Sequence, residues 1–400
     1  MFADTDPVIF DAGSVGDVVG AAATIALAAP GMVTAAHLGV LGVGSLCYRE
    51  RLPDRVPPVR FLVVVPAYNE ELVLAGTLEA ITASMRSRDQ VLVVDDRSTD
   101  RTGEIALGFG ATVLRREPGE PPGRAAARQA ALRHARSLEW DAMVMIDADS
   151  IVEPGFFDAC ERMLATGAVA LQARSEAAIG TRLIDQAALA SFAVQGVLMP
   201  RGRDALHGLV RLRGTGMVLR RDVIDGFEFR APASEDLVYA LDLCLAGIRI
   251  RHVESARLRS QNAGSWRTAT EQKMRYEVGR LAAAREYVRP LLASRKFAGV
   301  EAAWFLVSPP LANALTFLLL ALVVGLVIGP AWAVGIVVAA IATLSAAIGL
   351  AFVQARLHPR VILAVAVAPA YLAWKLLVQV RAMLSLRRGP YEFGATERHT

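Results

Sequence analysis

Two aspartates, Asp147 and Asp149, follow the apolar run Met143–Ile146. Such a run predicts a strand buried on both faces, so each carboxylate at its end must be solvated, paired or bound to a cation. Residues two apart on an extended chain point to the same face, so both can serve one ion. Hard oxygen ligands favour Mg²⁺ or Mn²⁺ bound to a substrate diphosphate. The alternative is that these residues only cap a helix beginning near Pro154.

Polar side chains also follow two earlier apolar runs. Asn69 and Glu70 come after the run at 61–67, and Asp95 and Asp96 end the run at 91–96. A carboxylate at a strand-to-helix turn accepts hydrogen bonds from a ribose hydroxyl or a base edge, which predicts a nucleotide site. The alternative is that Asp96 simply begins the next helix.

The elements that must position these acids alternate regularly along the chain. Short strands between helices of about a dozen residues predict an α/β fold with a mainly parallel, Rossmann-like sheet, whose strand ends share one edge. No GxGxxG follows the first strand and no GxxxxGK[ST] occurs, so a dinucleotide enzyme or a P-loop NTPase is unsupported. We predict strands over 61–67, 91–96, 112–116 and 141–149, and helices over 69–87, 98–110 and 123–138.

A set of motifs in a fixed order carries a family resemblance over about residues 60 to 280. "VVVPAYNEE", "VLVVDDRSTDRT", "MIDADS", "LRGTGMVL", "SEDLVYALDLCLAG" and "QKMRY" resemble those of the family 2 glycosyltransferases. They are most similar to the membrane-embedded branch, which includes cellulose, chitin and hyaluronan synthases. The resemblance implies a GT-A fold, a nucleotide-sugar donor, a divalent metal and inversion at the anomeric carbon.

The resemblance also implies roles at the donor site. Asp147 and Asp149 would bind the metal, Mg²⁺ or Mn²⁺, and Asp147 would face the diphosphate. Arg124 supplies a cation where related sequences often have Gly-Lys-Gly, and Arg128 would assist at the donor phosphates. The remaining nucleotide-sugar residues would be Ala67, Tyr68, Glu70, Asp95 and Asp96.

The catalytic residues implied by the resemblance are Asp236, Glu235, Gln272 and Arg275. An inverting single displacement needs one carboxylate to take the acceptor hydroxyl proton, a role that Asp236 would fill. The alternative is a helix N-terminal acid, with Ser234 as the cap. Arg275, three residues after Gln272 on one helix face, would stabilise the departing diphosphate; a solvated cationic face is its alternative.

Four residues are predicted to lie near the acceptor. Gly214, Thr215 and Gly216 would let the backbone approach the acceptor closely, although an ordinary tight turn is the alternative. Tyr276 stands where the processive branch usually carries Trp in its QxxRW pattern. A smaller ring can still stack on a sugar, but this departure weakens the case for an acceptor-holding role.

The composition indicates a membrane protein. Hydrophobic residues make up 54% of the chain and the mean hydropathy is +0.38, too apolar for a purely soluble protein. Uncharged segments at 18–48, 302–329 and 331–355 each exceed the roughly 20 residues that cross a bilayer. We therefore predict three transmembrane helices.

Basic residues predict the orientation. No Lys or Arg precedes Arg49, and four aspartates precede the first apolar segment. The positive-inside rule then places the N-terminus outside and the centre of the chain in the cytoplasm, as in a multi-pass protein of the inner (plasma) membrane. A cleaved signal peptide is the alternative, but it would begin with basic residues. The apolar segment 361–388 contains Lys375, Arg381 and Pro369, so it is predicted to be interfacial or re-entrant.

These features predict a linear domain organisation. A catalytic GT-A domain at 61–265 would lie in the cytoplasm between the first membrane helix and the second. The smaller segments would be an extracytoplasmic N-terminus at 1–17, a linker at 49–60, interfacial amphipathic helices at 266–300 and a cytoplasmic tail at 389–400.

Charge and cysteine content exclude other classes. The chain is basic, with a pI near 9.1, but it has no long Lys/Arg run, which favours an anionic membrane surface and anionic substrates over nucleic acid. Its three cysteines, Cys47, Cys160 and Cys244, have no CxxC spacing, which is typical of a reducing compartment.

The sequence thus predicts an inverting glycosyltransferase that takes a sugar from a nucleoside diphosphate donor, UDP-sugar favoured, at a cytoplasmic site. Its acceptor would be a membrane-presented hydroxyl of a polysaccharide, a glycolipid or a lipid-linked sugar. One alternative is a polyprenyl-phosphate sugar synthase, whose acceptor phosphate needs no strong base. Another is a non-catalytic membrane scaffold or transporter, which the few predicted crossings disfavour.

Overall fold

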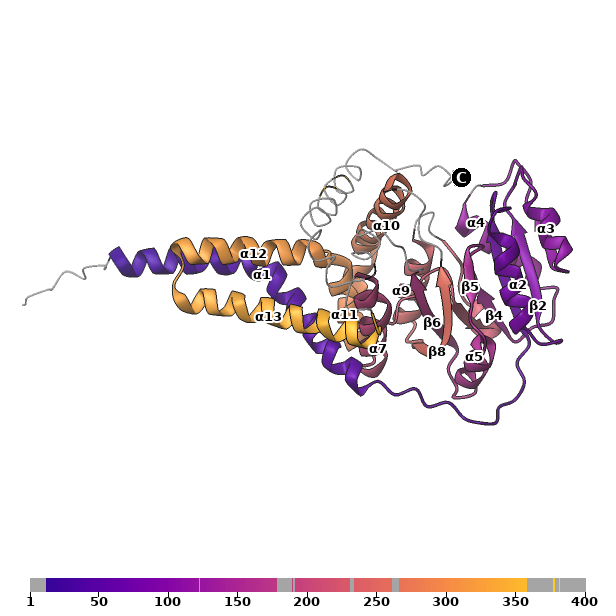
Figure 1. Cartoon of the computed structure of the whole chain (residues 1–400), viewed down its shortest axis with the longest axis horizontal. Coiled ribbons are helices and arrows are strands. Elements are labelled where there is room, and N and C mark those ends of the chain that lie inside the picture. The colour runs from indigo at the N-terminus through magenta and orange to yellow at the C-terminus, as the bar shows by residue number, and fades with distance from the viewer. Residues whose placement is uncertain are drawn as a thin grey trace, which may run out of the picture.

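The computed structural model describes residues 12–121, 123–177, 189, 191–230, 234–260, 266–357, 377 and 381, with only the backbone of 12–14, 266–269, 271 and 272. Most of the predicted segment 361–388 and the tail 389–400 lie outside the described residues. An α/β body occupies one end of the molecule, and a rod of three long helices projects from it (Figure 1).

The body is built on one mixed sheet. β1 pairs in parallel with β2 and with β4, and β2 pairs in parallel with β3, so the ends of these four strands share one edge as predicted. β7 joins β4 in the antiparallel sense and links this half to the rest of the sheet, in the order β3-β2-β1-β4-β7-β6-β8-β5. The strands are β1 Phe61–Ala67, β2 Gln90–Asp95, β3 Thr112–Arg115, β4 Ala142–Met145, β5 Ser150–Val152, β6 Ala170–Ala177, β7 Met217–Arg220 and β8 Ile250–Ser260.

Helices cover both faces of the sheet and form the rod. In the body they are α2 Leu74–Ser84, α3 Thr102–Gly108, α4 Arg124–Ala135, α5 Phe156–Leu164, η1 Val194–Leu198 (a π-helix), α7 Met199–Ala205, α8 Arg221–Ile224, α9 Glu235–Leu245, α10 Trp266–Ala293 and α11 Phe297–Val307. The rod consists of α1 Ala12–Cys47, α12 Leu311–Ile328 and α13 Ala331–Gln354.

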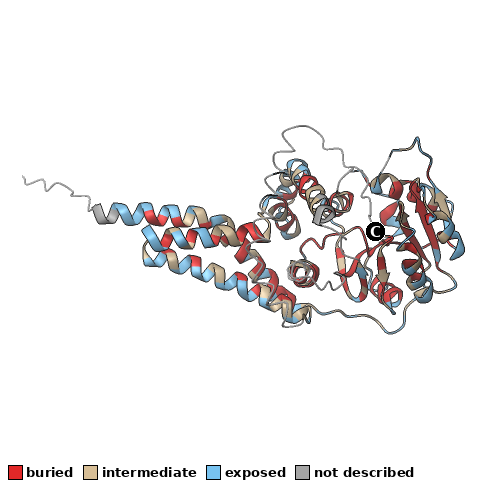
Figure 2. Cartoon of the chain, turned by 45° about the horizontal axis from the view of Figure 1, so that its top comes forward, coloured by how far each residue is buried: buried red, intermediate tan, exposed pale blue. Residues whose placement is uncertain are grey.

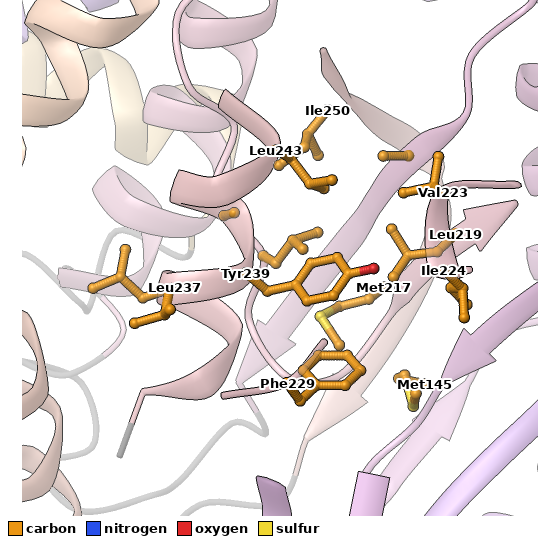
Figure 3. Close-up of a cluster of buried hydrophobic side chains, with 14 of the residues drawn as sticks. Met145, Met217, Leu219, Val223, Ile224, Phe229, Leu237, Tyr239, Leu243 and Ile250 are labelled. Carbon is orange, nitrogen blue, oxygen red and sulfur yellow. The ribbon is translucent and has the colours of Figure 1, made fainter. Parts of the chain in front are cut away.

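Alternating side chains of β1 divide the body into two cores. Leu62 and Val64 face the core formed with α4, α9, α10 and α11, whereas Phe61, Val63 and Val65 face the core formed with α2, α3 and α5. In the first core, Tyr239 of α9 stacks on Phe229 with ring centroids 4.6 Å apart, close to Met217 and Leu219 of β7 (Figure 3). This packing fixes α9, the helix that carries Asp236, to the sheet.

The rod consists of long apolar helices that pack through small residues. By length and composition, Val15–Cys47, Leu311–Ile328 and Ala331–Gln354 are three candidate membrane spans among the described residues. Small residues bring the helices together: a methyl group on Gly20 of α1 would lie 1.9 Å from the carbonyl oxygen of Ile328 in α12. The surface of the rod facing away from these contacts is exposed (Figure 2), and it carries many large hydrophobic side chains.

Several predicted boundaries need correction. The helices predicted over 69–87 and 98–110 are shorter in the structure, at Leu74–Ser84 and Thr102–Gly108. The segment 302–329 is not one helix, because Pro309 and Pro310 interrupt it between α11 and α12 and leave Ser308 extended. The strand predicted over 141–149 ends at Met145, and a turn closed by a hydrogen bond from the Ser150 amide to the Asp147 carbonyl (3.0 Å) follows it. Asp147 and Asp149 therefore lie in a turn, not on extended chain.

Candidate active site

The turn after β4 directs both aspartates away from the core. Ala148 between them is buried, and its carbonyl accepts a hydrogen bond from the Thr77 hydroxyl (2.7 Å), while Asp147 and Asp149 are half-buried. The Asp147 amide donates to the Thr215 hydroxyl (3.2 Å). The turn thus buries Ala148 and leaves both aspartates half-buried, and the charges of both act on Arg124.

At the end of β2, Asp96 is tied to two other elements. Its carboxylate accepts from Arg116 (2.6 Å), from Arg97 (3.1 Å) and from the amide of Gly123 (3.3 Å), and its own amide donates to the carbonyl of Ala67 (2.8 Å). Gly123 immediately precedes α4 and has a φ of 107°. Asp96 therefore holds the end of β1 and the start of α4 together, and a carboxylate retains acceptor capacity for a ribose hydroxyl.

Asp95 has a different environment from Asp96. It is 2% exposed, accepts a hydrogen bond from the Ser98 amide (2.9 Å) and lies 3.0 Å from the position of a methyl group on Gly103. These contacts fix the turn into α3. Of the other predicted donor residues, Ala67 is buried, Tyr68 and Glu70 are half-buried, and the Glu70 amide donates to the Thr102 hydroxyl (2.9 Å).

Arg128 of α4 is the central cation of the site. It is fully buried and donates to Glu235 of α9 (2.7 Å) and to the carbonyl of Gly214 (2.8 Å). Its guanidinium also lies 3.6 Å from the Asp147 carboxylate. Arg128 therefore joins α4, α9, the turn after β4 and the loop before β7 at one point.

Gly214 lies where these groups converge. A methyl group on it would lie 3.1 Å from Arg128 Nη2, 3.6 Å from Asp236 Oδ2 and 3.9 Å from Asp147 Oδ2, and its φ is 79°. Any side chain at this position would enter the space between the two carboxylates, and the left-handed backbone favours glycine. The structure thus brings together the predicted acceptor segment, the predicted base and the predicted diphosphate-facing aspartate.

The environment of Asp236 alters its acidity. Burial and the neighbouring Glu235 raise the pKa of Asp236 to about 6, against the lowering effect of Arg128. Ser234 precedes the helix, but its side chain makes no capping hydrogen bond; instead, Asp236 accepts from the Leu237 amide (2.8 Å). A carboxylate with a pKa near 6 has the proton affinity of a general base.

Two further arginines lie within electrostatic reach of the acids. The exposed Arg124 guanidinium is 3.5 Å from Asp147, and the charges of Asp147 and then of Glu235 raise the pKa of Arg124. Burial and Arg124 lower the pKa of Arg275, against the opposing effect of the same acids. Arg275 of α10 is therefore close enough to these acids for their charges to interact.

The remaining predicted residues have mixed outcomes. The side chain of Gln272 lies outside the described residues. Tyr276 directs its hydroxyl to Arg211 and its ring to Lys273, whose ammonium is 4.8 Å from the ring centroid. Thr215 donates to Ser150 of β5 (3.1 Å), and the Gly216 amide donates to the Met145 carbonyl at the end of β4 (2.7 Å), so these two residues are fixed to the sheet.

Sequence reasoning missed several residues that shape this region. Gln172 of β6 accepts from the Arg213 amide (3.0 Å) and donates to the Thr215 carbonyl (2.9 Å), which holds the acceptor segment in place. Arg116, directly after β3, could have been found as a cation at the strand edge that carries Asp96. Nothing in the sequence around Arg211 and Arg213 indicated that these two residues lie near the site.

Among the described residues, no three His, Cys, Asp or Glu side chains are grouped so that they could hold a metal ion by themselves. The candidate ligands Asp147 and Asp149 supply two carboxylates. Mg²⁺ is commonly bound by one or two carboxylates plus substrate phosphates, so this pair fits an ion that binds together with a diphosphate.

Comparisons with known proteins give the family. A family model described as glycosyltransferase-like family 2 matches residues 57–279, more than half of the 400-residue chain. A probable glycosyltransferase of Bacillus subtilis, YdaM, is 26% identical over 247 residues, 58% of this chain and 57% of that protein. The glucosyl-3-phosphoglycerate synthase of Mycobacterium tuberculosis is 35% identical over 92 residues, 22% of this chain and 28% of that protein. The chain thus spans little more than half the length of the Bacillus relative.

The fold has a counterpart among solved structures. The mannosyltransferase PcManGT from Pyrobaculum calidifontis, solved in complex with GDP-Man and Mn²⁺, superposes with a TM-score of 0.55 at 19% sequence identity. The alignment covers 90% of this chain and 99% of that one. Together with the family match, this similarity identifies the mixed sheet and its helices as a GT-A fold. The chain therefore belongs to the glycosyltransferase-like family 2.

Proposed function

We propose that this chain is a metal-dependent, inverting glycosyltransferase that moves a sugar from a nucleoside diphosphate donor to a hydroxyl acceptor presented at a membrane. The observation that carries the proposal is the convergence of Asp236, Asp147 and Arg128 around the backbone of Gly214. A base, a diphosphate-facing acid and a buried cation within a few ångströms are what a single displacement at an anomeric carbon requires.

The proposed reaction uses the geometry of α9. Asp236 takes the proton of the acceptor hydroxyl, the hydroxyl oxygen forms a bond to the anomeric carbon, and the bond from that carbon to the diphosphate breaks. The nucleoside diphosphate leaves with the bonding electron pair. Arg124 and Arg275, which lie within reach of the acids, stabilise its negative charge.

Asp147 and Asp149 are the proposed metal ligands. A divalent ion supplies charge neutralisation for the diphosphate when bound. Asp147 is already 3.5 Å from Arg124 and 3.6 Å from Arg128, so its position depends on two cations that also face the donor. The mannosyltransferase to which the fold is similar is solved with GDP-Man and Mn²⁺, which supports testing Mn²⁺ first and including a GDP-sugar among the donors.

A donor panel tests the proposal. Purified protein in detergent would be incubated with UDP-sugars and GDP-mannose, and nucleoside diphosphate release measured with Mn²⁺ or with EDTA. We expect Mn²⁺-dependent release from one donor, UDP-sugar favoured, and its loss in Asp149→Asn. The exposed Asp222 pairs with Arg220 in β7 and accepts a hydrogen bond from the Val223 amide (3.1 Å), so Asp222→Asn is the matched control. Absence of metal-dependent release across the panel would overturn the proposal.

The membrane context is part of the proposal. We place α1, α12 and α13 across the inner membrane, with the α/β body in the cytoplasm, as in the membrane-embedded branch of the family. Support comes from the three apolar helices and from the basic residues that follow α1. Cys47 is exposed at the end of α1, whereas Cys160 is buried.

Cys47 allows a direct test of orientation. In a Cys160→Ser, Cys244→Ser background, a membrane-impermeant maleimide should label Cys47 only after the cells are permeabilised. Labelling in intact cells would contradict a cytoplasmic body.

A further inference from the structure

Two arginines beside the proposed catalytic base differ from the other buried arginines. Arg211 and Arg213 precede Gly214 in the loop that enters β7. Arg211 is buried, with 9% of its surface exposed, and Arg213 is half-buried. Within the described part of the chain, neither has a carboxylate at ion-pairing distance; their polar partners are a tyrosine hydroxyl and a backbone carbonyl.

Arg211 is held by aromatic groups from the helices next to the rod. Its guanidinium carbon lies 4.2 Å from the ring centroid of Phe305 in α11, and it donates to the hydroxyl of Tyr276 in α10. Its buried Nε has no hydrogen-bond partner among the described residues. Arg128, which pairs with Glu235, also has an Nε without a partner in the described part of the chain, so the feature that distinguishes Arg211 is the missing carboxylate and not this nitrogen alone.

Arg213 extends the same positive region toward the base. Its guanidinium carbon lies 5.6 Å from the ring centroid of Phe192, and it donates to the carbonyl of Gln195 in η1. Burial and the nearby Arg211 lower the pKa of Arg213 to about 9, and the charge of Asp236 opposes this shift. Arg213 is thus close enough to Asp236 for their charges to interact.

Other buried arginines show what these two lack. Arg128 pairs with Glu235 at 2.7 Å, Arg203 with Glu301 at 2.7 Å and Arg116 with Asp96 at 2.6 Å. Removing a cation from water costs several kcal/mol unless a counter-charge compensates it. Two neighbouring guanidinium groups that have no counter-charge form a site for an anion that accepts two hydrogen bonds, such as a phosphate.

We propose that Arg211 and Arg213 bind the phosphate of a phosphate-bearing lipid acceptor and thereby place its hydroxyl beside Asp236. The inference rests on the proposed function and adds the chemical class of the acceptor. The location favours a lipid because Phe305 lies in α11, which leads directly into α12, and Gln195 lies in η1, which packs with α1 and α13. A lipid phosphate at the end of the rod reaches this position without leaving the membrane surface.

Binding measurements on the full-length protein in detergent micelles test the site. The probes are phosphatidic acid, diacylglycerol and glycerol 3-phosphate. We expect phosphatidic acid to bind and diacylglycerol not to bind. Arg211→Gln and Arg213→Gln should each weaken phosphatidic acid binding by roughly ten- to a hundredfold, the effect of losing a hydrogen bond to a charged group. Arg220→Gln, at the exposed end of β7, is the matched control and should bind as the wild type does.

Further arms separate the possible failures. Arg213→Lys keeps the charge and the fold but loses the two-pronged geometry, so it should bind more weakly than wild type and more tightly than Arg213→Gln. Nucleoside diphosphate binding with Mn²⁺ should be unchanged in all four variants, which separates this inference from the donor site. Equal affinity of wild type and Arg213→Gln for phosphatidic acid would overturn the site. Glycerol 3-phosphate binding as tight as phosphatidic acid would overturn the lipid as its source.

Discussion

The acidic edge of the sheet and the Arg211–Arg213 pair hold their charges in different ways. At the edge, three acids have an arginine within 4 Å: Asp96 has Arg116, and Asp147 and Glu235 share Arg128. At the arginine pair, aromatic rings and neutral oxygens surround the cations. These acids at the edge therefore have counter-charges without a nucleotide, whereas the arginine pair has none among the described residues.

This difference indicates how the two substrates are recognised. When a metal–diphosphate complex binds at the ion-paired acids, new contacts would replace some of the existing ion pairs. In the proposed acceptor site, cations that lack a carboxylate partner beside the rod would select a charged acceptor and exclude a neutral one, because a neutral ligand would leave them uncompensated. Asp236 lies between the two regions, with its carboxylate 3.6 Å from the position of a methyl group on Gly214.

The largest effect is expected at the base between the two regions. Asp236→Asn keeps the shape of the side chain but cannot take a proton, so transfer to a hydroxyl should fall by roughly 10²- to 10⁴-fold. Mn²⁺-dependent nucleoside diphosphate binding should remain. Initial rates against the Asp222→Asn control measure this effect. Full activity in Asp236→Asn would favour the alternative of a polyprenyl-phosphate sugar synthase, whose acceptor needs no base.

The next largest effect is expected on stability, at the ion pair between Arg128 and Glu235. Arg128→Met leaves Glu235 buried without its partner, which should reduce the free energy of unfolding by about 3–5 kcal/mol. Chemical denaturation followed by tryptophan fluorescence measures the loss, and Arg133→Met on the exposed face of the same helix is the control. Adding Glu235→Gln to Arg128→Met should recover part of it. An Arg128→Met protein as stable as the control would show that this pair does not support the site.

The rod is expected to respond to smaller changes. Gly20→Ala places a methyl group 1.9 Å from the Ile328 carbonyl oxygen, so α1 and α12 must separate, at a cost of about 1–3 kcal/mol. Gly16 has nothing within 4 Å, and Gly16→Ala should be neutral or slightly stabilising. Thermal unfolding in detergent compares the two variants. Equal melting temperatures would mean that α1 and α12 are not in close contact.

The smallest expected effect is the pH dependence of Asp236. Activity needs its ionised form, so the rate should fall about tenfold per pH unit below about 6, because the pKa is raised to about 6. The contribution of Asp236 to the free energy of unfolding changes in the opposite direction: it falls as the pH rises. A raised pKa means that the contribution of this group to folding is present below its unfolded pKa of about 4 and is lost as pH rises through about 6.

Asp236→Asn separates the two readouts of this titration. The variant should be more stable than wild type above pH 6, by about 1–3 kcal/mol, and equal to it at pH 4. Denaturation curves at the two pH values measure the difference. A rate that stays constant down to pH 5 would remove Asp236 from the role of base.

Local sequence patterns predicted the donor half well. The apolar β-branched run at 61–67 is β1 with the predicted bounds, and the acids after β1, β2 and β4 share one sheet edge. The pairings of β5 to β8 were not predictable, because they join segments far apart in the chain and depend on tertiary packing. The two consecutive prolines, Pro309 and Pro310, could have predicted the break, but the uncharged run around them suggested one continuous helix.

Burial is the other property that the sequence did not reveal. "RLRGTG" alternates basic and apolar residues, a pattern typical of a solvated strand, yet Arg211 is buried against Phe305, almost one hundred residues away. Asp95 and Asp96 are adjacent and identical, but only the fold makes Asp95 a turn-forming residue and Asp96 the partner of Arg116. Such differences arise from the packing of distant segments and not from local composition.

The most direct test of the central claim is the metal dependence of nucleotide binding. Titration calorimetry of UDP with Mn²⁺ or with EDTA, on wild type and Asp149→Asn, measures whether the acidic edge binds an ion and a diphosphate together. We expect at least about tenfold tighter binding with Mn²⁺ in wild type, consistent with one charge-assisted ligand contact, and no such gain in Asp149→Asn. Equal UDP affinity with and without Mn²⁺ in wild type, or an undiminished gain in Asp149→Asn, would contradict the account.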